Sequence, residues 1–89
     1  MKIEFKKSFA KDLKKKSDNR RLMNKARQVI EQVEEAEDLN CITNLKKLKA
    51  EGSYYRIRSG DYRFGMVIEN ETVIFVRFLH RSEIYRYFP

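Results

Sequence analysis

The sequence predicts one α+β domain, residues 1–89, in which an N-terminal strand and a helical hairpin precede a three-stranded antiparallel meander, with the helices packed on one sheet face. Eighty-nine residues with 42% hydrophobic content suffice for one modest core and are too few for two. Apolar residues between positions 22 and 33 recur at helical spacing, whereas from Tyr54 onward apolar and polar residues alternate between turn signals. Helices that share one core with an antiparallel sheet define this fold class.

The first elements are a short strand and a short helix. Lys2–Phe5 alternates polar and apolar side chains, as a strand with one buried face does. Ser8 is the expected N-cap of the following helix, because its hydroxyl can accept a hydrogen bond from a free backbone N–H. In that helix Phe9 and Leu13, four residues apart, form a narrow apolar stripe.

A second helix is predicted after the start signal Ser17-Asp18. One of its faces carries six apolar residues: Leu22, Met23, Ala26, Val29, Ile30 and Val33. Asp38 to Glu51 is less regular, and its apolar residues fit a short helix or a short strand.

The last third reads as strands. Tyr54–Arg58 and Tyr62–Glu69 alternate on either side of the turn Ser59-Gly60-Asp61, and Asn70-Glu71 makes the next turn. Thr72–Leu79 is so apolar that we expect it in the middle of the sheet, covered on both faces over much of its length. The tail HRSEIYRYFP closes the chain as a turn or short helix.

The charge distribution indicates an anionic partner. The net charge is +7 and the sequence pI about 9.7, which favours nucleic acid, the ribosome or an acidic protein, and least of all a membrane. All eleven lysines lie at or before Lys49, whereas six arginines and no lysine follow Ala50. Arginine binds phosphate or carboxylate bidentately, so the C-terminal half is the expected anion-binding part.

Several kinds of chemistry are excluded by residue counts. The single cysteine, Cys41, excludes an internal disulfide, fits a reducing cytoplasm and is interpreted as a small, semi-buried hydrophobic residue. One histidine and one cysteine give no zinc-ligand spacing, and three scattered glycines form no phosphate loop. We therefore expect no metal, no cofactor, and a reaction on an anionic substrate that uses arginine, lysine, tyrosine and at most one histidine.

RNA cleavage by its own 2′-hydroxyl fits these residues. In Tyr54–Arg58, the side chains of Arg56 and Arg58 point away from the core, so several arginines share one sheet face. Such cations can stabilise charge developing on a phosphate, while His80 or Tyr85 can take part in proton transfer. Tyr85 can also stack on a splayed base. The sequence leaves the general base open between His80, Tyr85 and an arginine with a shifted pKa.

The segment YYRIRSGDYRFGMVIENETVIFVRFLHRSEIY resembles the C-terminal half of RelE/ParE-superfamily toxins, whose pattern runs roughly YRIRxGDYRxxY, a hydrophobic strand, then HRxxVY. The basic helical hairpin and NLKKLK extend the resemblance over nearly the whole chain. The resemblance implies the RelE-like fold and, for the RelE branch, a cytoplasmic ribosome-dependent mRNA endonuclease without a metal. It also implies an acidic antitoxin as partner, and operator DNA for the toxin–antitoxin complex.

The resemblance assigns a role to each residue that matches the pattern. Arg56 and Arg58 fall where RelE-branch toxins contact and activate RNA, and Arg63 falls on the arginine that stabilises the phosphate. Tyr85 falls on the base-stacking tyrosine, and two further matches are His80 and Arg81. Expected additional RNA contacts are Lys46, Lys47, Lys49 and Arg77. Two positions depart from the pattern: Phe64-Gly65 replaces a more usual aliphatic and aromatic pair, and Leu79 replaces a common glycine.

Structural roles are open to several of the same residues. Arg63 can instead cap its turn by pairing with Asp61, His80 can be a structural hydrogen-bonding residue, and Tyr87 and Phe88 can pack the C-terminus onto the sheet. At the level of function, the alternatives are a ParE-like inhibitor of DNA gyrase and a degenerate member that binds only its antitoxin and operator DNA.

Overall fold

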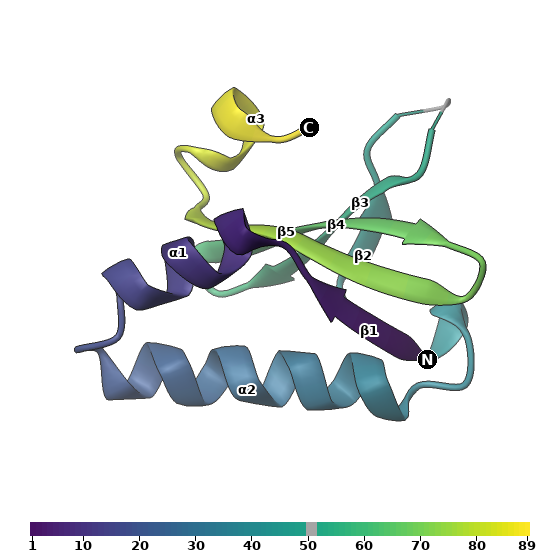
Figure 1. Ribbon diagram of the computed structural model, residues 1–89, viewed down its shortest axis with the longest axis horizontal. Helices are drawn as coiled ribbons and strands as arrows, with labels where there is room; N and C mark the ends of the chain where they lie inside the picture. The colour runs from purple at the N-terminus through teal and green to yellow at the C-terminus, as the bar shows by residue number, and fades with distance from the viewer. Residues whose placement is uncertain (50–51) are drawn as a thin grey trace.

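The computed structural model describes residues 1–49 and 52–89 and contains a five-stranded sheet with helices on both sides (Figure 1). In chain order the elements are β1 (Lys2–Phe5), α1 (Lys7–Lys15), α2 (Arg20–Glu35), the 3₁₀ turn η1 (Leu39–Cys41), β2 (Leu45–Lys47), β3 (Tyr54–Ser59), β4 (Tyr62–Glu69), β5 (Thr72–His80) and α3 (Ile84–Tyr87). The α+β prediction, with an N-terminal strand, a helical hairpin and a strand meander, is confirmed.

The strand order is β1-β5-β4-β3-β2, in which β1 runs parallel to β5 and every other pair is antiparallel. The meander therefore has four strands rather than the three predicted, because β2 adds to its edge. The irregular segment from Asp38 contains both a short helical turn and a short strand. Its predicted end, Ala50 and Glu51, lies outside the described residues.

The two expected helix caps are wrong in detail. α1 begins at Lys7, and the Ser8 hydroxyl donates to the Val76 carbonyl over 2.6 Å instead of capping the helix. α2 is capped by Asn19 rather than Ser17-Asp18, since the Asn19 side chain accepts from the Leu22 backbone N–H at 3.1 Å.

α1 follows β1 so closely that it covers the part of β5 that β1 does not reach. The pairing of β1 ends at Phe5, opposite Phe75. Beyond it, Ser8 donates to the Val76 carbonyl, and the Asp12 carboxylate accepts from the Phe78 N–H over 2.9 Å. Side chains of α1 thus make hydrogen bonds with backbone groups of β5 that a neighbouring strand would otherwise pair with.

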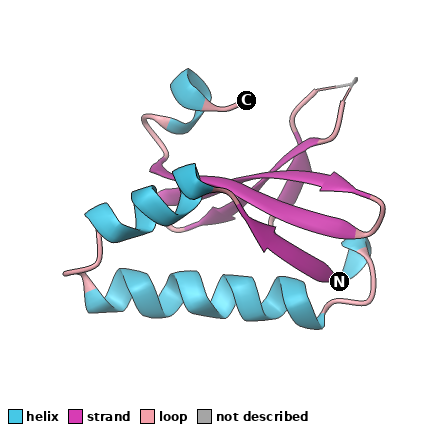
Figure 2. Cartoon of the chain, viewed as in Figure 1, coloured by secondary structure: helices cyan, strands magenta, loops and turns pink. Residues whose placement is uncertain are grey.

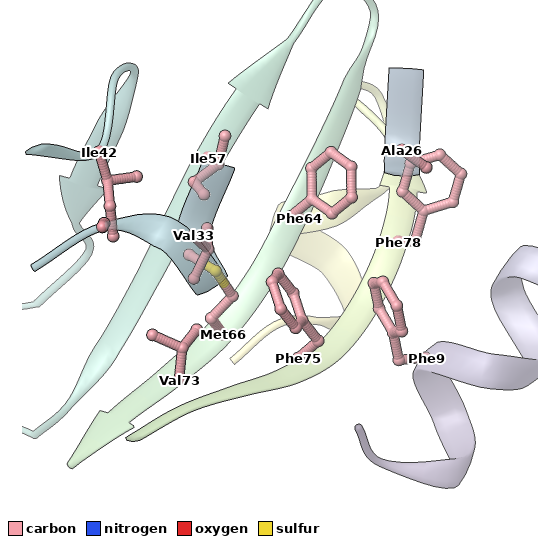
Figure 3. Packing of buried hydrophobic residues seen from close by; sticks show 11 residues of the cluster. Phe9, Ala26, Val33, Ile42, Ile57, Phe64, Met66, Val73, Phe75 and Phe78 are labelled. Atoms are coloured by element: carbon pink, nitrogen blue, oxygen red, sulfur yellow. The ribbon is translucent and has the colours of Figure 1, made fainter. Parts of the chain in front are cut away.

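Figure 2 shows the helical hairpin on one side of the sheet. We call the sheet face that is turned toward α2 the inner face, and the opposite face the outer face. The inner face carries the core (Figure 3), which consists of Phe9, Ala26, Val33, Ala36, Ile42, Ile57, Phe64, Met66, Val73, Phe75 and Phe78. Pairing of Gly65 with Arg77 and of Met66 with Phe75 leaves Val76 as a β-bulge. Because of this bulge, Phe75 and Phe78, three residues apart, both point inward.

Three smaller expectations can be checked against the fold. The turn between β4 and β5 is Asn70-Glu71, both with positive φ (50° and 61°), as a two-residue hairpin requires. β5 is an interior strand, but its residues between the core positions are only half-buried, so it is fully covered on one face alone. Cys41 is exposed rather than semi-buried. Among the described residues, no helix is long and apolar enough to cross a membrane.

Candidate functional site

The outer face of the sheet gathers basic side chains from three neighbouring strands. Ile57 and Phe64 are opposite one another and buried in the core, so the residues on either side of them point outward. This places Arg58 directly opposite Arg63, and Arg56 opposite Gly65. On the side of β3 away from β4, Lys46 of β2 pairs with Arg56 and extends the basic face to the sheet edge.

Arg63 lies in the middle of this charge. Its Nη1 donates to the carbonyls of Gly60 at 2.8 Å and Tyr62 at 3.0 Å, so the guanidinium caps the β3–β4 turn through backbone oxygens. Burial lowers the pKa of Arg63, and the charge of Arg56 lowers it further. Smaller influences on this pKa come from Tyr85, which raises it, and from Arg58 and Arg81, which lower it. These neighbouring side chains therefore influence the pKa of Arg63.

Arg56 is fixed at one end of its guanidinium. Its Nη1 donates to the Asn44 carbonyl at 2.8 Å, and the same carbonyl accepts from the Arg58 backbone N–H at 3.1 Å. Asn44 has a φ of 61°, which turns its carbonyl toward β3. The Nε of Arg56 is buried and has no hydrogen-bond partner among residues 1–49 and 52–89. A buried donor of this kind favours an added acceptor, since leaving it unmet costs about 1–3 kcal/mol.

The segment after β5 adds Arg81 and Tyr85 to this group. The Arg81 backbone N–H donates to the Asp61 carbonyl at 2.7 Å, and its Nε lies 3.9 Å from the Asp61 carboxylate. Asp61 thus faces Arg81 and not Arg63, contrary to the alternative drawn from the sequence. Tyr85 belongs to α3, which lies on the side of the sheet away from α2 (Figure 1), and its side chain is 61% exposed.

His80 is not part of this group. It pairs across the sheet with Tyr62, whose ring stacks on the core residue Phe78, so His80 lies on the inner side. The His80 ring stands edge-on to Tyr62, and its Nδ1 accepts from the Ser82 backbone N–H at 3.2 Å. In the neutral ring the proton is then on Nε2. A hollow of about 180 Å³ is also on this side and is lined by Asp12, Lys15, Lys16, Tyr62, Phe78, Leu79, His80 and Glu83.

Arg77, which the sequence suggested as an RNA contact, has its guanidinium bound to Asp12. The Nε and Nη2 atoms of Arg77 lie 2.7 Å and 3.1 Å from the two carboxylate oxygens of Asp12, which is 4% exposed. The hydrogen bonding that Arg77 donates to the Asp12 carboxylate raises the pKa of Arg77. Arg77 also lies against the Tyr87 ring, 5.6 Å from its centre. Asp12 was missed from the sequence because it stands in a lysine-rich helix with no sign of a distant partner.

The three lysines that the sequence suggested as RNA contacts, Lys46, Lys47 and Lys49, differ in position. Lys47 pairs with Tyr55 and therefore points to the inner side of the sheet edge, opposite to its neighbour Lys46. Lys49 is exposed in the segment after β2. Within the described part of the chain, no group of three histidine, cysteine, aspartate or glutamate side chains could hold a metal ion.

The chain is similar to known toxins over nearly all of its length. Residues 3–85 match the family described as the ParE toxin of the type II toxin–antitoxin system parDE. Toxin RelE3 of Methanocaldococcus jannaschii is 42% identical over 90 residues that cover all of both chains. The toxin in the RelB–RelE antitoxin–toxin complex from Methanococcus jannaschii is 40% identical, with a TM-score of 0.77 over 97% of this chain and 99% of that one. YafQ from E. coli has the same fold at 18% identity, with a TM-score of 0.71 over 90% of this chain and 92% of that one.

Proposed function

Because the chain belongs to the RelE/ParE superfamily of toxins from toxin–antitoxin systems, we propose that it is a ribosome-dependent endoribonuclease that cuts mRNA in the decoding site. The observation that carries this proposal is the convergence of Arg56, Arg58, Arg63, Arg81 and Tyr85 on the outer face. Four guanidinium groups, to which residues 1–49 and 52–89 offer one weak ion pair, that of Asp61 with Arg81, fit a phosphate backbone. The similarity to Toxin RelE3 over the whole chain supports the RelE branch.

The proposed chemistry needs neither metal nor cofactor. The RNA 2′-hydroxyl loses its proton as its oxygen attacks the adjacent phosphorus. The bond to the 5′-oxygen breaks and that oxygen takes up a proton, so the products are a 2′,3′-cyclic phosphate and a 5′-hydroxyl. Arg63 binds the non-bridging oxygens, where negative charge develops. Arg56 and Arg58 hold the backbone and, as nearby cations, favour ionisation of the 2′-hydroxyl.

Tyr85 and Arg81 complete the proposed site. Tyr85 is exposed beside Arg63, and its ring can stack on a base next to the scissile phosphate. Arg81 is our secondary candidate for the group that acts on the leaving-group side. His80 and Arg77 are left out of the catalytic group, since one lies on the inner side and the other is held by Asp12.

We propose an acidic antitoxin as the protein partner and the cytoplasm as the location. The RelB–RelE complex supports this partnership for a toxin that is 40% identical to this chain. A net charge of +7 favours acidic proteins, the ribosome and, for the toxin–antitoxin complex, operator DNA. Lys46 and the exposed Lys47 and Lys49 add salt-dependent attraction to RNA.

Inhibition of DNA gyrase is the second candidate function, because the matching family model is that of the ParE toxin. A gyrase inhibitor needs no reacting group. It predicts inhibition of supercoiling by the purified protein, and no effect on mRNA.

The test is primer extension on a defined mRNA in a purified translation system, with and without ribosomes. Wild type is compared with Arg63→Ala and with Arg27→Ala, a matched loss of one exposed arginine on α2. We expect cuts within the codon in the decoding site, only when ribosomes are present. Loss of one charge-stabilising donor should slow cutting about 10²–10³-fold in Arg63→Ala, with little change in Arg27→Ala.

Each contrary outcome identifies what fails. If folded wild type makes no cuts, the nuclease proposal is wrong, and a supercoiling assay with purified gyrase tests the second candidate. If Arg63→Ala cuts as fast as wild type, the role assigned to Arg63 is wrong.

A further inference from the structure

We propose that the C-terminal segment is a built-in anchor for Tyr85, and that Gly65 and Phe88 are positioning residues for it. The anchor consists of Ile84, Tyr87 and Phe88, which hold α3 on the outer face while the Tyr85 side chain is left largely exposed. The expected effect on cleavage rests on the proposed function. The expected effect on the position of Tyr85 does not.

Gly65 provides a notch for the Phe88 ring. A Cβ atom on Gly65 would lie 2.7 Å from two of the Phe88 ring carbons, so no residue larger than glycine fits under the ring as it stands. Phe88 is 3% exposed, and its ring meets the Tyr54 ring edge-on, with 5.8 Å between centres. Glycine in a strand weakens the strand and often marks a close approach of another group. Here that group is the Phe88 ring.

Two further contacts hold the same segment. Ile84 is fully buried, and its carbonyl accepts from the Phe88 backbone N–H at 2.8 Å. Tyr87 lies against the guanidinium of Arg77, which Asp12 holds by two hydrogen bonds. The anchor is therefore connected through Arg77 to α1 as well as to β4.

A four-residue helix has no stability of its own, so packing must determine its position. In α3 and the residue after it, Ile84 and Phe88 are buried and Tyr85 is largely exposed. The position of Tyr85 consequently depends on side chains on either side of it. Gly65 also explains one departure from the family pattern, since a side chain at this position would occupy the place of the Phe88 ring.

The first experiment measures the position of residue 85 without any RNA. The chain has no tryptophan, so Tyr85→Trp supplies a single fluorescent reporter. In this background we compare Phe88→Ala and Gly65→Ala with Phe5→Ala, which removes a half-exposed ring from β1 on the other side of the sheet. We expect acrylamide quenching of the tryptophan to rise about twofold when the anchor is lost, as local order decreases. The Phe5→Ala control should match the parent.

Circular dichroism and thermal melting identify the variants that remain folded. Gly65 is buried, so Gly65→Ala is the variant at greater risk, and Phe88→Ala keeps the test decisive. Unchanged quenching in folded Phe88→Ala would overturn the anchor, whether or not the protein cuts RNA.

The second experiment is a double-mutant cycle on ribosome-dependent cleavage. A displacement of about 1 Å can slow a reaction about 10²-fold, so we expect Phe88→Ala to lower kcat strongly and leave KM for ribosomes nearly unchanged. In a Tyr85→Ala background, Phe88→Ala should have no further effect. Additive losses would show that Phe88 acts on the whole fold and not through Tyr85. If wild type does not cut at all, the proposed function fails while the quenching result still stands.

Discussion

The two faces of the sheet are built from the same strands but have opposite physical characters. Ile57 is buried in the core, while its neighbours Arg56 and Arg58 point outward, and Phe64 has the same relation to Arg63. The inner face packs aromatic rings, with 5.0 Å between the centres of Phe64 and Phe78. The outer face places like charges opposite each other, which destabilises a sheet. Most of the apolar packing therefore lies on the inner face, and the outer face concentrates positive charge at some cost to stability.

Two arginines of the outer face make the same contrast at the level of single residues. The carboxylate of Asp12 raises the pKa of Arg77, so that cation stabilises the fold. Burial and the neighbouring arginine Arg56 lower the pKa of Arg63. Folding therefore disfavours the charged form of Arg63, and this cost falls only as pH rises through the lowered pKa, whereas the hydrogen bonds to the Gly60 and Tyr62 carbonyls still cap the turn. At neutral pH, a bound anion would offset the cost of the charged Arg63 side chain.

The largest expected effect is on the inner face. Phe75→Ala removes a fully buried ring that contacts Phe9 and Phe64, and it should lower the free energy of unfolding by about 3–5 kcal/mol. Urea denaturation measures this change. The control is Phe5→Ala, because the Phe5 ring is half-exposed and its loss should lower the free energy of unfolding less. Equal losses in the two variants would contradict the assignment of the core.

Asp12→Asn should give the next largest effect, because it leaves Arg77 without its counter-charge. Removing one partner of a largely buried ion pair costs about 3 kcal/mol. The same urea titration measures the loss, with Asp61→Asn as the control, since the pair of Asp61 with Arg81 is exposed and long. A negligible effect of Asp12→Asn would mean that α1 does not hold the β5 edge through this carboxylate.

A smaller effect should come from anions. Sulfate, compared with chloride at equal ionic strength, should bind the unneutralised outer-face arginines and raise the free energy of unfolding. At ten times its dissociation constant, the gain is about 1.4 kcal/mol. Thermal melts of wild type and Arg63→Ala measure it, and the gain should shrink in the variant. The same gain in both would place the anion elsewhere.

Local patterns predicted much of this molecule. The bounds of Lys2–Phe5 and Tyr62–Glu69 agree with β1 and β4, and the alternation in YYRIRS correctly places Arg56 and Arg58 outward. These features depend on neighbours along the chain. The sequence did not identify the three-residue β2 as a strand, because the alternation of side chains cannot be detected in so short a segment.

What local patterns could not predict depends on distant residues. The Val76 bulge changes the face of every residue after it in β5, and it arises from pairing with β4. The partner of Arg77 is 65 positions away, in a helix where Asp12 resembles any surface charge. The side of the sheet on which His80 lies follows from its pairing with Tyr62 and not from the HR motif.

The central claim is that the arginines of the proposed site serve RNA cleavage, and Arg58→Gln tests most directly whether one of them serves cleavage and not the fold. Arg58 is exposed, lies opposite Arg63, and its side chain makes no hydrogen bond or ion pair with any described residue. Unfolding free energy and ribosome-dependent cleavage are measured on the same preparation at low salt. We predict stability that is unchanged or higher by about 0.2–1 kcal/mol, with cleavage slowed about 10²-fold. Cleavage at the wild-type rate, or a clear loss of stability, would contradict the claim.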